Sequence, residues 1–171
     1  MVTRRAFLAA LGSTGVAATG VAAGVKFLGS NGEAAPTEPT IQYGAEACVR
    51  CRMVIDDARF AAAWIEVDGS EVHFDDIGCA ALEAAERELA LDARIFVHDL
   101  SSEVWLDGRS ARYVHSATLR TPMAYGAVAL VDQAAADSLA HKLQGHAARW
   151  EDLATLLTQP EPPQPHSGHG S

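Results

Sequence analysis

Alternating apolar and polar positions divide the middle of the chain into short strands separated by helices. The alternation runs through residues 60–67 and 71–74, on either side of an Asp-Gly dipeptide at 68–69 that is typical of hairpin turns. Helical spacing of apolar residues then predicts a helix over about 76–89. A further apolar run at 94–97 is interpreted as a strand. This half is therefore predicted to follow the order strand, strand, helix, strand.

The second half repeats this order with different residues. An Asp-Gly dipeptide at 107–108 is predicted to join its first two strands in a hairpin. The expected elements are strands at 104–106, 111–114 and 127–131, a helix at 133–143, a short strand at 147–150 and a helical turn at 151–157. We therefore predict an α+β protein in which two similar ββαβ units, residues 47–103 and 104–158, pack together.

The two ends of the chain differ in composition from this middle. Residues 1–35 begin with paired arginines before a weakly apolar run, a pattern typical of the twin-arginine export signal. The run is also long enough to remain in a bilayer as an N-terminal anchor if it is not cleaved. Residues 36–46 are predicted to be a linker, and the Pro- and His-containing residues 159–171 a disordered tail. The predicted location is extracytoplasmic, in the periplasm or on the outer face of the membrane.

Charge and motif content exclude several classes of function. The formal net charge is −9 at pH 7, which disfavours nucleic acid and anionic membrane surfaces as partners. The sequence contains no nucleophile elbow, zinc-protease motif, phosphate-binding loop or dinucleotide fingerprint. We therefore predict that the protein is not an enzyme and binds no nucleic acid.

Three sulfur-bearing side chains, those of Cys48, Cys51 and Met53, lie within six residues. Copper(I) is a soft ion that accepts thiolate and thioether ligands at low coordination number. If the segment is extended, Cys51 and Met53 point to the same face, because side chains alternate along a strand. Cys48 lies within reach across a turn. The segment therefore predicts copper(I) binding, with transfer to a partner by ligand exchange.

Two other chemistries compete for the same cysteines. A Cys-x-x-Cys pair is also typical of thiol–disulfide oxidoreductases, although these enzymes place the pair at the start of a helix that follows a strand. A structural zinc site usually has four nitrogen or sulfur ligands, and the sequence offers no second pair at suitable spacing. A thiol–disulfide oxidoreductase and a zinc-stabilised interaction module are therefore the alternatives.

Further candidate ligands lie elsewhere in the chain. Met123 belongs to a Pro- and Gly-containing segment, where packing on a helix face does not explain it. Cys79 falls in the first turn of a predicted helix, which lowers a thiol pKa, but a buried core position explains it more simply. His98 and His115 end predicted strands and are weaker candidates.

Other polar residues near these candidate ligands are explained by their expected place in a strand or at the start of a helix. His73 alternates with Val72 and Phe74, so it is expected to face solvent. Asp75 and Asp76 form a pair of carboxylates, and we interpret one of them as the N-cap of the following helix.

Several segments, taken in order, resemble the NosL family, the accessory proteins of nitrous oxide reductase assembly. The resemblance covers about residues 47–153. It is carried by Cys48-x-x-Cys51-x-Met53, Phe74-Asp75-Asp76-Ile77-Gly78-Cys79, Val104-Trp105-Leu106-Asp107, Ala111-Arg112-Tyr113-Val114 and Thr121-Pro122-Met123 followed by Gly126.

The resemblance implies a copper(I) metallochaperone that supplies nitrous oxide reductase. The expected partner is this copper-receiving enzyme or a copper transporter. It also implies a duplicated ββαβ fold, distantly like that of organomercurial lyase. The implied ligands are Cys51 and Met53, with Met123 or a histidine as third donor. Two features depart from the family pattern: the lipobox cysteine common in the family is absent, and Arg52 stands where glycine is often found.

Overall fold

The computed structural model of the chain describes residues 37–159. The predicted export segment and the predicted tail, apart from residue 159, lie outside these residues. No helix within 37–159 is long and apolar enough to cross a membrane.

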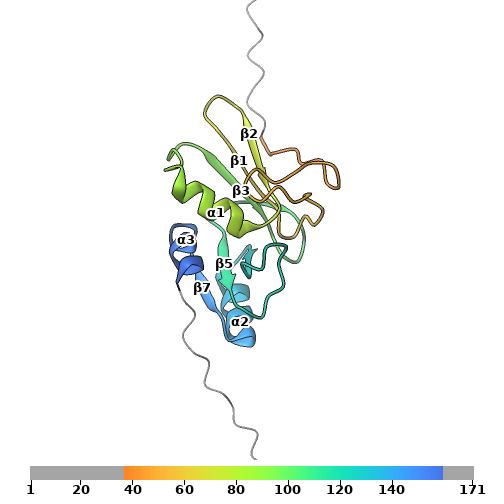
Figure 1. Cartoon of the computed structure of the whole chain (residues 1–171). Coiled ribbons are helices and arrows are strands. Elements are labelled where there is room, and N and C mark those ends of the chain that lie inside the picture. Colours follow the sequence, from red (N-terminus) through yellow and green to blue (C-terminus); the bar gives the residue numbers. More distant parts are fainter. Residues whose placement is uncertain (1–36, 160–171) are drawn as a thin grey trace, which may run out of the picture. The chain divides into compact units, whose positions relative to one another are not determined.

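The first half of the described chain forms a four-stranded antiparallel sheet and one helix. Its elements are β1 (Ala62–Ile65), β2 (Glu71–Phe74), α1 (Ile77–Glu86), β3 (Arg94–His98) and β4 (Trp105–Asp107). The strand order is β2-β1-β3-β4, and α1 covers one face of this sheet (Figure 1). The hairpin predicted around the Asp-Gly dipeptide at 68–69 is confirmed, since β1 and β2 pair across it.

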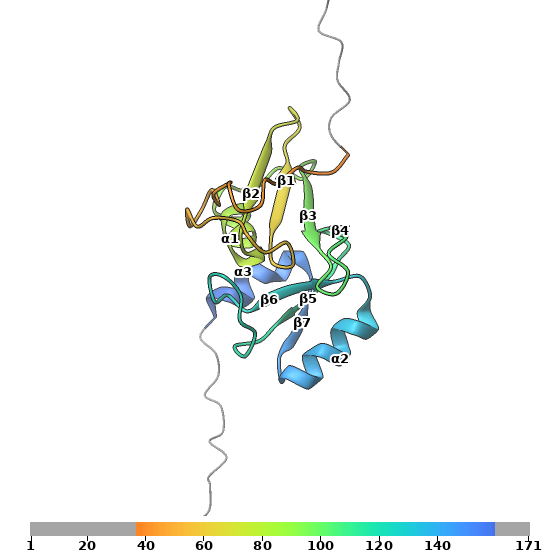
Figure 2. The same cartoon turned by 90° about the vertical axis from the view of Figure 1, so that its right-hand side faces the viewer.

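The second half forms a smaller antiparallel sheet with two helices. Its elements are β5 (Arg112–His115), β6 (Ala127–Leu130), α2 (Gln133–Leu143), β7 (His146–Ala148) and α3 (Trp150–Thr158). The strand order is β6-β5-β7. Helix α2 packs on this sheet on the side away from the first sheet (Figure 2), whereas α3 contacts α1 and β5.

The two halves share one topology. In each half the first strand lies in the centre of the sheet, paired on one side with the next strand and on the other with the strand that follows the helix. The order β1-β2-α1-β3 is thus repeated by β5-β6-α2-β7. The predicted α+β class with two similar ββαβ units is confirmed.

Strand β4 does not join the second unit, in contrast to the sequence-based expectation. It pairs with β3 of the first sheet, with Leu106 opposite Val97. The Asp-Gly dipeptide forms a local turn instead of a hairpin, because the Asp107 side chain accepts a hydrogen bond from the Arg109 N–H at 2.8 Å. Gly108 N–H then donates to the Ile95 carbonyl at 2.7 Å. The prediction that β4 and β5 form a hairpin is therefore wrong.

Most of the buried apolar side chains form one core that draws on both halves. It includes Trp64 and Phe74 of the first sheet, Tyr113 of β5 and Leu153 of α3. Both faces of the second sheet are covered, since Val114 and its neighbours pack in a smaller cluster against α2. Cys48 and Cys79 belong to the larger core. The buried thiols of Cys48 and Cys79 therefore belong to the core that the two halves share.

His73 is buried rather than exposed to solvent. Its Nδ1 lies 2.7 Å from Glu46 Oε1 and its Nε2 lies 3.0 Å from Glu71 Oε2, and the residue is only 7% exposed. Glu71 also accepts a hydrogen bond from the Thr40 N–H at 2.9 Å. The segment 40–46, which was predicted as linker, thus covers this face of β2. The solvent-facing interpretation of His73 is wrong because alternation along a strand does not reveal what packs on its outer face.

Candidate metal centre

The two cysteines of the Cys-x-x-Cys pair lie in a closed loop between residues 46 and 55. The Cys48 N–H donates to the Met53 carbonyl at 2.8 Å, and the Arg52 N–H donates to the Cys48 carbonyl at 3.1 Å. These two bonds close a tight turn over the pair. The turn buries Cys48 completely and leaves Cys51 partly exposed.

Met53 is not on the same strand face as Cys51. Arg52 between them has a φ of 68°, in the left-handed region, so the segment turns at this residue. The predicted extended geometry is wrong, because alternation of side chains requires an extended backbone. The Met53 residue is 55% exposed. Its role as a ligand stays a prediction.

The left-handed conformation of Arg52 gives a direct test of this loop. Replacing Arg52 with glycine is expected to stabilise the folded chain by about 1 kcal/mol, because glycine adopts positive φ without steric cost. Urea unfolding of the two chains measures the difference. The matched control is Arg52→Ala, which removes the long side chain but keeps a Cβ and should not stabilise the fold. An Arg52→Gly chain less stable than the Arg52→Ala chain would contradict the assigned backbone conformation.

The junction of β2 and α1 brings a carboxylate and a third thiol to this loop. Asp76 is the N-cap of α1, and its Oδ1 accepts a hydrogen bond from the Gly78 N–H at 2.8 Å. This confirms the predicted cap. Asp75 precedes the cap and Cys79 lies in the first turn of the helix, and both residues are buried. The buried position expected for Cys79 is also confirmed.

Four side chains converge from these two segments. The Sγ atoms of Cys48, Cys51 and Cys79 and a carboxylate oxygen of Asp75 all lie within 4.8 Å of one another. The Cys51 thiol donates to Asp75 Oδ1 at 3.0 Å. All three cysteines are free thiols. We call Cys48, Cys51, Cys79 and Asp75 the thiol cluster. Its donors form a candidate metal site that is largely shielded from solvent.

The three thiols differ in their affinity for protons. A hydrogen bond from the Cys79 thiol lowers the pKa of Cys48 to about 6. Burial and the neighbouring Asp75 carboxylate raise the pKa of Cys51 to about 12. The hydrogen bond with Cys48 and burial also raise the pKa of Cys79. Of the three thiols, that of Cys48 therefore loses its proton most readily, and a metal that binds all three sulfurs displaces the protons that the thiols hold.

The loop that carries the first two thiols is anchored to α1 by Arg50. Its guanidinium lies 2.9 Å from a Glu83 oxygen and 2.6 Å from a Glu86 oxygen. Both carboxylates project from the helix whose first turn carries the third thiol. The anchor thus ties the Cys-x-x-Cys loop to the element that carries Cys79.

A third segment, residues 121–126, is attached to the same junction. Asp76 Oδ2 accepts hydrogen bonds from the Thr121 hydroxyl at 2.6 Å and from the Met123 N–H at 3.0 Å. The Tyr125 ring lies so close to Gly78 that a Cβ at position 78 would overlap it. The Met123 side chain is half-buried and packs against the larger core. Packing thus accounts for part of its environment, and its role as a ligand stays a prediction.

The structure does not bring the two candidate histidines into the thiol cluster. His98 Nδ1 lies 2.7 Å from the Glu103 carbonyl and Nε2 lies 2.8 Å from the Tyr43 hydroxyl, and the ring stacks on Trp105. His115 lies on β5, opposite Ala127 and His146. Neither is among the described side chains whose ligand atoms lie within 4.8 Å of one another. Ligation by His98 or His115 stays a prediction of the sequence.

The buried position of His98 predicts a dependence of stability on pH. Burial lowers the pKa of His98 below its ordinary value of 6.5, so the unfolded chain takes up the proton more readily. The stability from neutral His98 is present above about pH 6.5 and is lost as the pH falls further. Between pH 7.5 and pH 5, the free energy of unfolding in urea should fall less steeply for His98→Gln than for the wild-type chain. The exposed control His141→Gln should keep the wild-type slope. Equal slopes for both variants would contradict the assignment.

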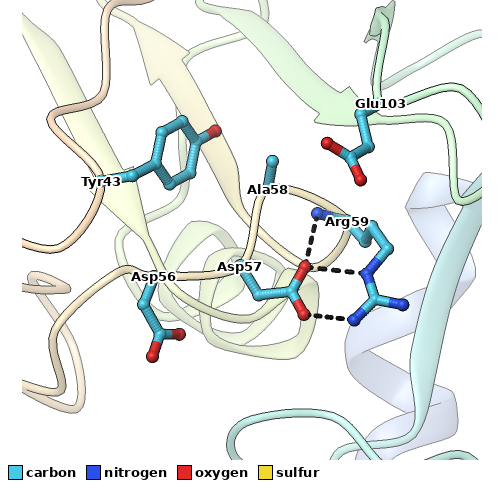
Figure 3. Close-up of a pocket in the computed structure, with 6 residues that line it drawn as sticks. All are labelled: Tyr43, Asp56, Asp57, Ala58, Arg59 and Glu103. Carbon is cyan, nitrogen blue, oxygen red and sulfur yellow. Dashed lines mark hydrogen bonds and ion pairs between the residues drawn. The ribbon is translucent and has the colours of Figure 1, made fainter.

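The surface also has a polar hollow of about 510 Å³, and none of the thiol-cluster residues lines it. Figure 3 shows its six lining residues, Tyr43, Asp56, Asp57, Ala58, Arg59 and Glu103. Asp57 is engaged by Arg59, whose Nε donates to its Oδ1 at 2.9 Å. Because the Arg59 guanidinium neutralises the Asp57 carboxylate, Asp57 is not available in this hollow as one member of a general acid–base pair.

The comparisons with known proteins bear on the family and the fold of the chain. The NosL family model matches residues 40–157. The chain belongs to the NosL family. Its fold is also similar to a crystal structure described as the copper chaperone NosL from Shewanella denitrificans, with a TM-score of 0.58 and 15% sequence identity. The match covers 68% of this chain and 96% of the Shewanella chain. A comparison with curated proteins finds no match. The predicted family is therefore confirmed.

In this NosL-family chain, the sequence did not identify Asp75 of the thiol cluster as a candidate donor. Asp75 was interpreted only as part of a helix cap, although Asp76 alone performs that role. The signal available in the sequence was the position of Asp75, directly after a predicted strand and in the same junction as Cys79. That signal becomes useful only when the Cys-x-x-Cys loop is known to fold onto the same junction.

Proposed function

We propose that this NosL-family chain is an exported copper(I) metallochaperone and not an enzyme. The observation that carries the proposal is the convergence of three free thiols within 4.8 Å of one another. Thiolates are the ligands that copper(I) prefers, and two or three of them suffice for this ion. The description of the Shewanella protein as a copper chaperone supports the same cargo for this chain.

The three thiols differ in their exposure to solvent, and this difference suggests separate roles in the binding and the release of copper. Cys48 and Cys79 are fully buried and would hold the ion, whereas Cys51 is partly exposed and would exchange it. We propose the exposed thioether of Met53 as an accessory donor that contacts incoming or departing copper and also supports the bound ion. Transfer then proceeds by ligand exchange, in which a partner's thiolate or imidazole enters before the last chain ligand leaves. Met123 is the other thioether that we propose as an accessory donor.

The proposed recipient is an extracytoplasmic copper enzyme, nitrous oxide reductase in particular, with a copper transporter as the other candidate partner. Support comes from membership in the NosL family and from the twin-arginine pattern at the N-terminus. The proposed location is the periplasm or the outer face of the membrane. An uncleaved N-terminal segment would make the chain membrane-anchored.

A thiol–disulfide oxidoreductase is favoured by one feature, the low pKa of the Cys48 thiol. The burial of that thiol weighs against this function, because Cys48 is 0% exposed and a protein disulfide must reach the attacking sulfur. The partly exposed member, Cys51, has a raised pKa and is a poor nucleophile near neutral pH.

An anaerobic copper(I) titration of the reduced full chain against a chromophoric copper(I) chelator tests the proposal. We expect one tight equivalent. Met53→Leu should lower the affinity about tenfold, a loss at the low end of the range for residues that support a metal site. Met123→Leu is the matched variant for the half-buried thioether. If the wild-type chain takes no copper from the chelator, the metallochaperone proposal fails. If Met53→Leu binds as tightly as the wild type, only the role of Met53 fails.

A further inference from the structure

The polar hollow shown in Figure 3 lies beside the base of the Cys-x-x-Cys loop. The Gly44 N–H donates to the Ile55 carbonyl at 2.8 Å, and this bond closes the base of the loop. The chain on its two sides supplies Tyr43 and Asp56 to the hollow. Asp56 follows Met53 by three residues, so their Cα atoms are at most about 11 Å apart. The hollow therefore lies close to the exposed end of the candidate copper site.

A second wall of the hollow comes from the turn between β3 and β4. Glu103 in this turn has a φ of 56°, and its N–H donates to the Asp99 carbonyl at 2.9 Å. Because a carbonyl only accepts hydrogen bonds, the His98 Nδ1 donates to the Glu103 carbonyl at 2.7 Å, and its Nε2 is the acceptor for the Tyr43 hydroxyl at 2.8 Å. The buried histidine thus holds both walls in place. Figure 3 shows the Tyr43 hydroxyl and the Glu103 carboxylate pointing toward each other.

The charge of the hollow favours a cation. Its lining contains three carboxylates and one guanidinium, which gives a net charge of −2. Arg59 pairs with Asp57, and this leaves Asp56 and Glu103 without an ion-pair partner among residues 37–159. Burial and the charges of Glu103 and Asp57 raise the pKa of Tyr43 to about 12. The Tyr43 ring adds an aromatic surface that attracts cations, and a volume of about 510 Å³ admits a lysine or arginine side chain.

Apolar side chains are exposed on the same segments. Four of the seven exposed large apolar residues within 37–159 belong to the chain around the hollow: Tyr43, Met53, Val54 and Val104. Val54 precedes Asp56 by two residues, and Val104 directly follows Glu103. Apolar contacts beside complementary charges are typical of protein–protein interfaces. The surface around the hollow therefore has the composition of a docking site for another protein.

We propose that the copper-exchanging partner docks here and places a lysine or arginine side chain in the hollow. The docking surface consists of Tyr43, Val54, Asp56, Glu103 and Val104. Apolar side chains of the partner cover the two valines, and its basic side chain pairs with the two carboxylates. The inference deepens the proposed function, on which it rests, because contact here brings a ligand of the partner close to Met53. Charges at such a surface speed the encounter and orient the partner more than they add affinity.

The first test asks whether the hollow accepts a basic group. The reduced, metal-free full chain, labelled with nitrogen-15, is titrated with N-acetylarginine amide and with its uncharged isostere, N-acetylcitrulline amide. We expect the arginine compound to shift the amide signals of Ala58 and Glu103 with a millimolar Kd, and the citrulline compound to leave them nearly unchanged. Glu103→Gln should weaken the binding about threefold. Glu88→Gln is the matched control, because Glu88 is also exposed, has a φ of 51° and lies outside the hollow.

The second test measures the rate of copper(I) transfer from the loaded full chain to metal-free nitrous oxide reductase at low and high salt. The double variant Asp56→Asn/Glu103→Gln should transfer copper(I) about tenfold more slowly than the wild type at low salt, and the difference should shrink at high salt. Its copper(I) affinity should stay within about twofold of the wild type, since neither residue belongs to the thiol cluster. Glu88→Gln should transfer copper(I) at the wild-type rate.

The inference is overturned if the arginine and citrulline compounds bind alike, or if Glu103→Gln binds the arginine compound as tightly as Glu88→Gln does. It is also overturned if the double variant transfers copper(I) as fast as an active wild-type chain. A wild-type chain that binds no copper(I), or delivers none to the reductase, would overturn the proposed function instead. The two amide probes would then decide whether the hollow takes a basic group.

Discussion

Replacing Cys79 with serine should lower the copper(I) affinity of the chain at least about 100-fold, or about 2.7 kcal/mol. The sequence alone favours a core position for Cys79, and on that interpretation the substitution would leave copper binding unchanged. The structure brings Cys79 within 4.8 Å of Cys48 and Cys51, so its sulfur is a candidate donor of the proposed site. The measurement is an anaerobic competition titration, with Cys51→Ser alongside as the reference for a lost ligand.

The Cys79→Ser result is interpretable only if the variant folds. Serine is close to cysteine in size, and urea unfolding of the metal-free variant checks that the core persists. A folded Cys79→Ser chain with wild-type copper affinity would remove Cys79 from the site. The copper site would then rest on Cys48, Cys51 and the two predicted thioethers.

Replacing Asp76 with alanine should destabilise the fold by about 3 kcal/mol. Asp76 is 0% exposed and accepts three hydrogen bonds, from the Gly78 N–H, the Thr121 hydroxyl and the Met123 N–H. Its removal leaves those donors without their acceptor, and each costs about 1 kcal/mol or more. Urea unfolding of the metal-free chain measures the loss.

The chain offers a matched control in Asp132, the N-cap of α2. Asp132 is exposed and accepts one capping bond, from the Ala135 N–H at 2.7 Å. Asp132→Ala should therefore cost only about 1 kcal/mol. Equal losses for the two variants would show that Asp76 is an ordinary helix cap and does not hold the 121–126 segment to the thiol-bearing junction.

Helices and strands could be predicted from the sequence where residues close together in the chain determine them. Helix α2 begins and ends at the predicted residues, 133 and 143, because an aspartate cap precedes it and a glycine lies beyond its end. The pairing of β4 was not predictable in this way. Which sheet a three-residue strand joins depends on contacts distant in sequence, and the Asp-Gly dipeptide at 107–108 suits a local turn as well as a hairpin.

The candidate site was predictable in part for the same reason. The spacing of Cys48 and Cys51 is a local signal, and it identified the loop. The contribution of Cys79 and Asp75 depends on how that loop folds onto the start of α1, which no spacing reveals. The alternation argument for Met53 failed at a single residue, Arg52, whose left-handed backbone changes the direction of the segment.

Copper K-edge X-ray absorption of the copper(I)-loaded full chain tests the central claim most directly, since it reports the atoms bound to the metal. The account predicts a low-coordinate shell of sulfur, with three sulfurs in the wild-type chain and one fewer in Cys79→Ser. A shell of nitrogen or oxygen atoms in the wild-type chain would contradict the assignment of copper(I) to the thiol cluster.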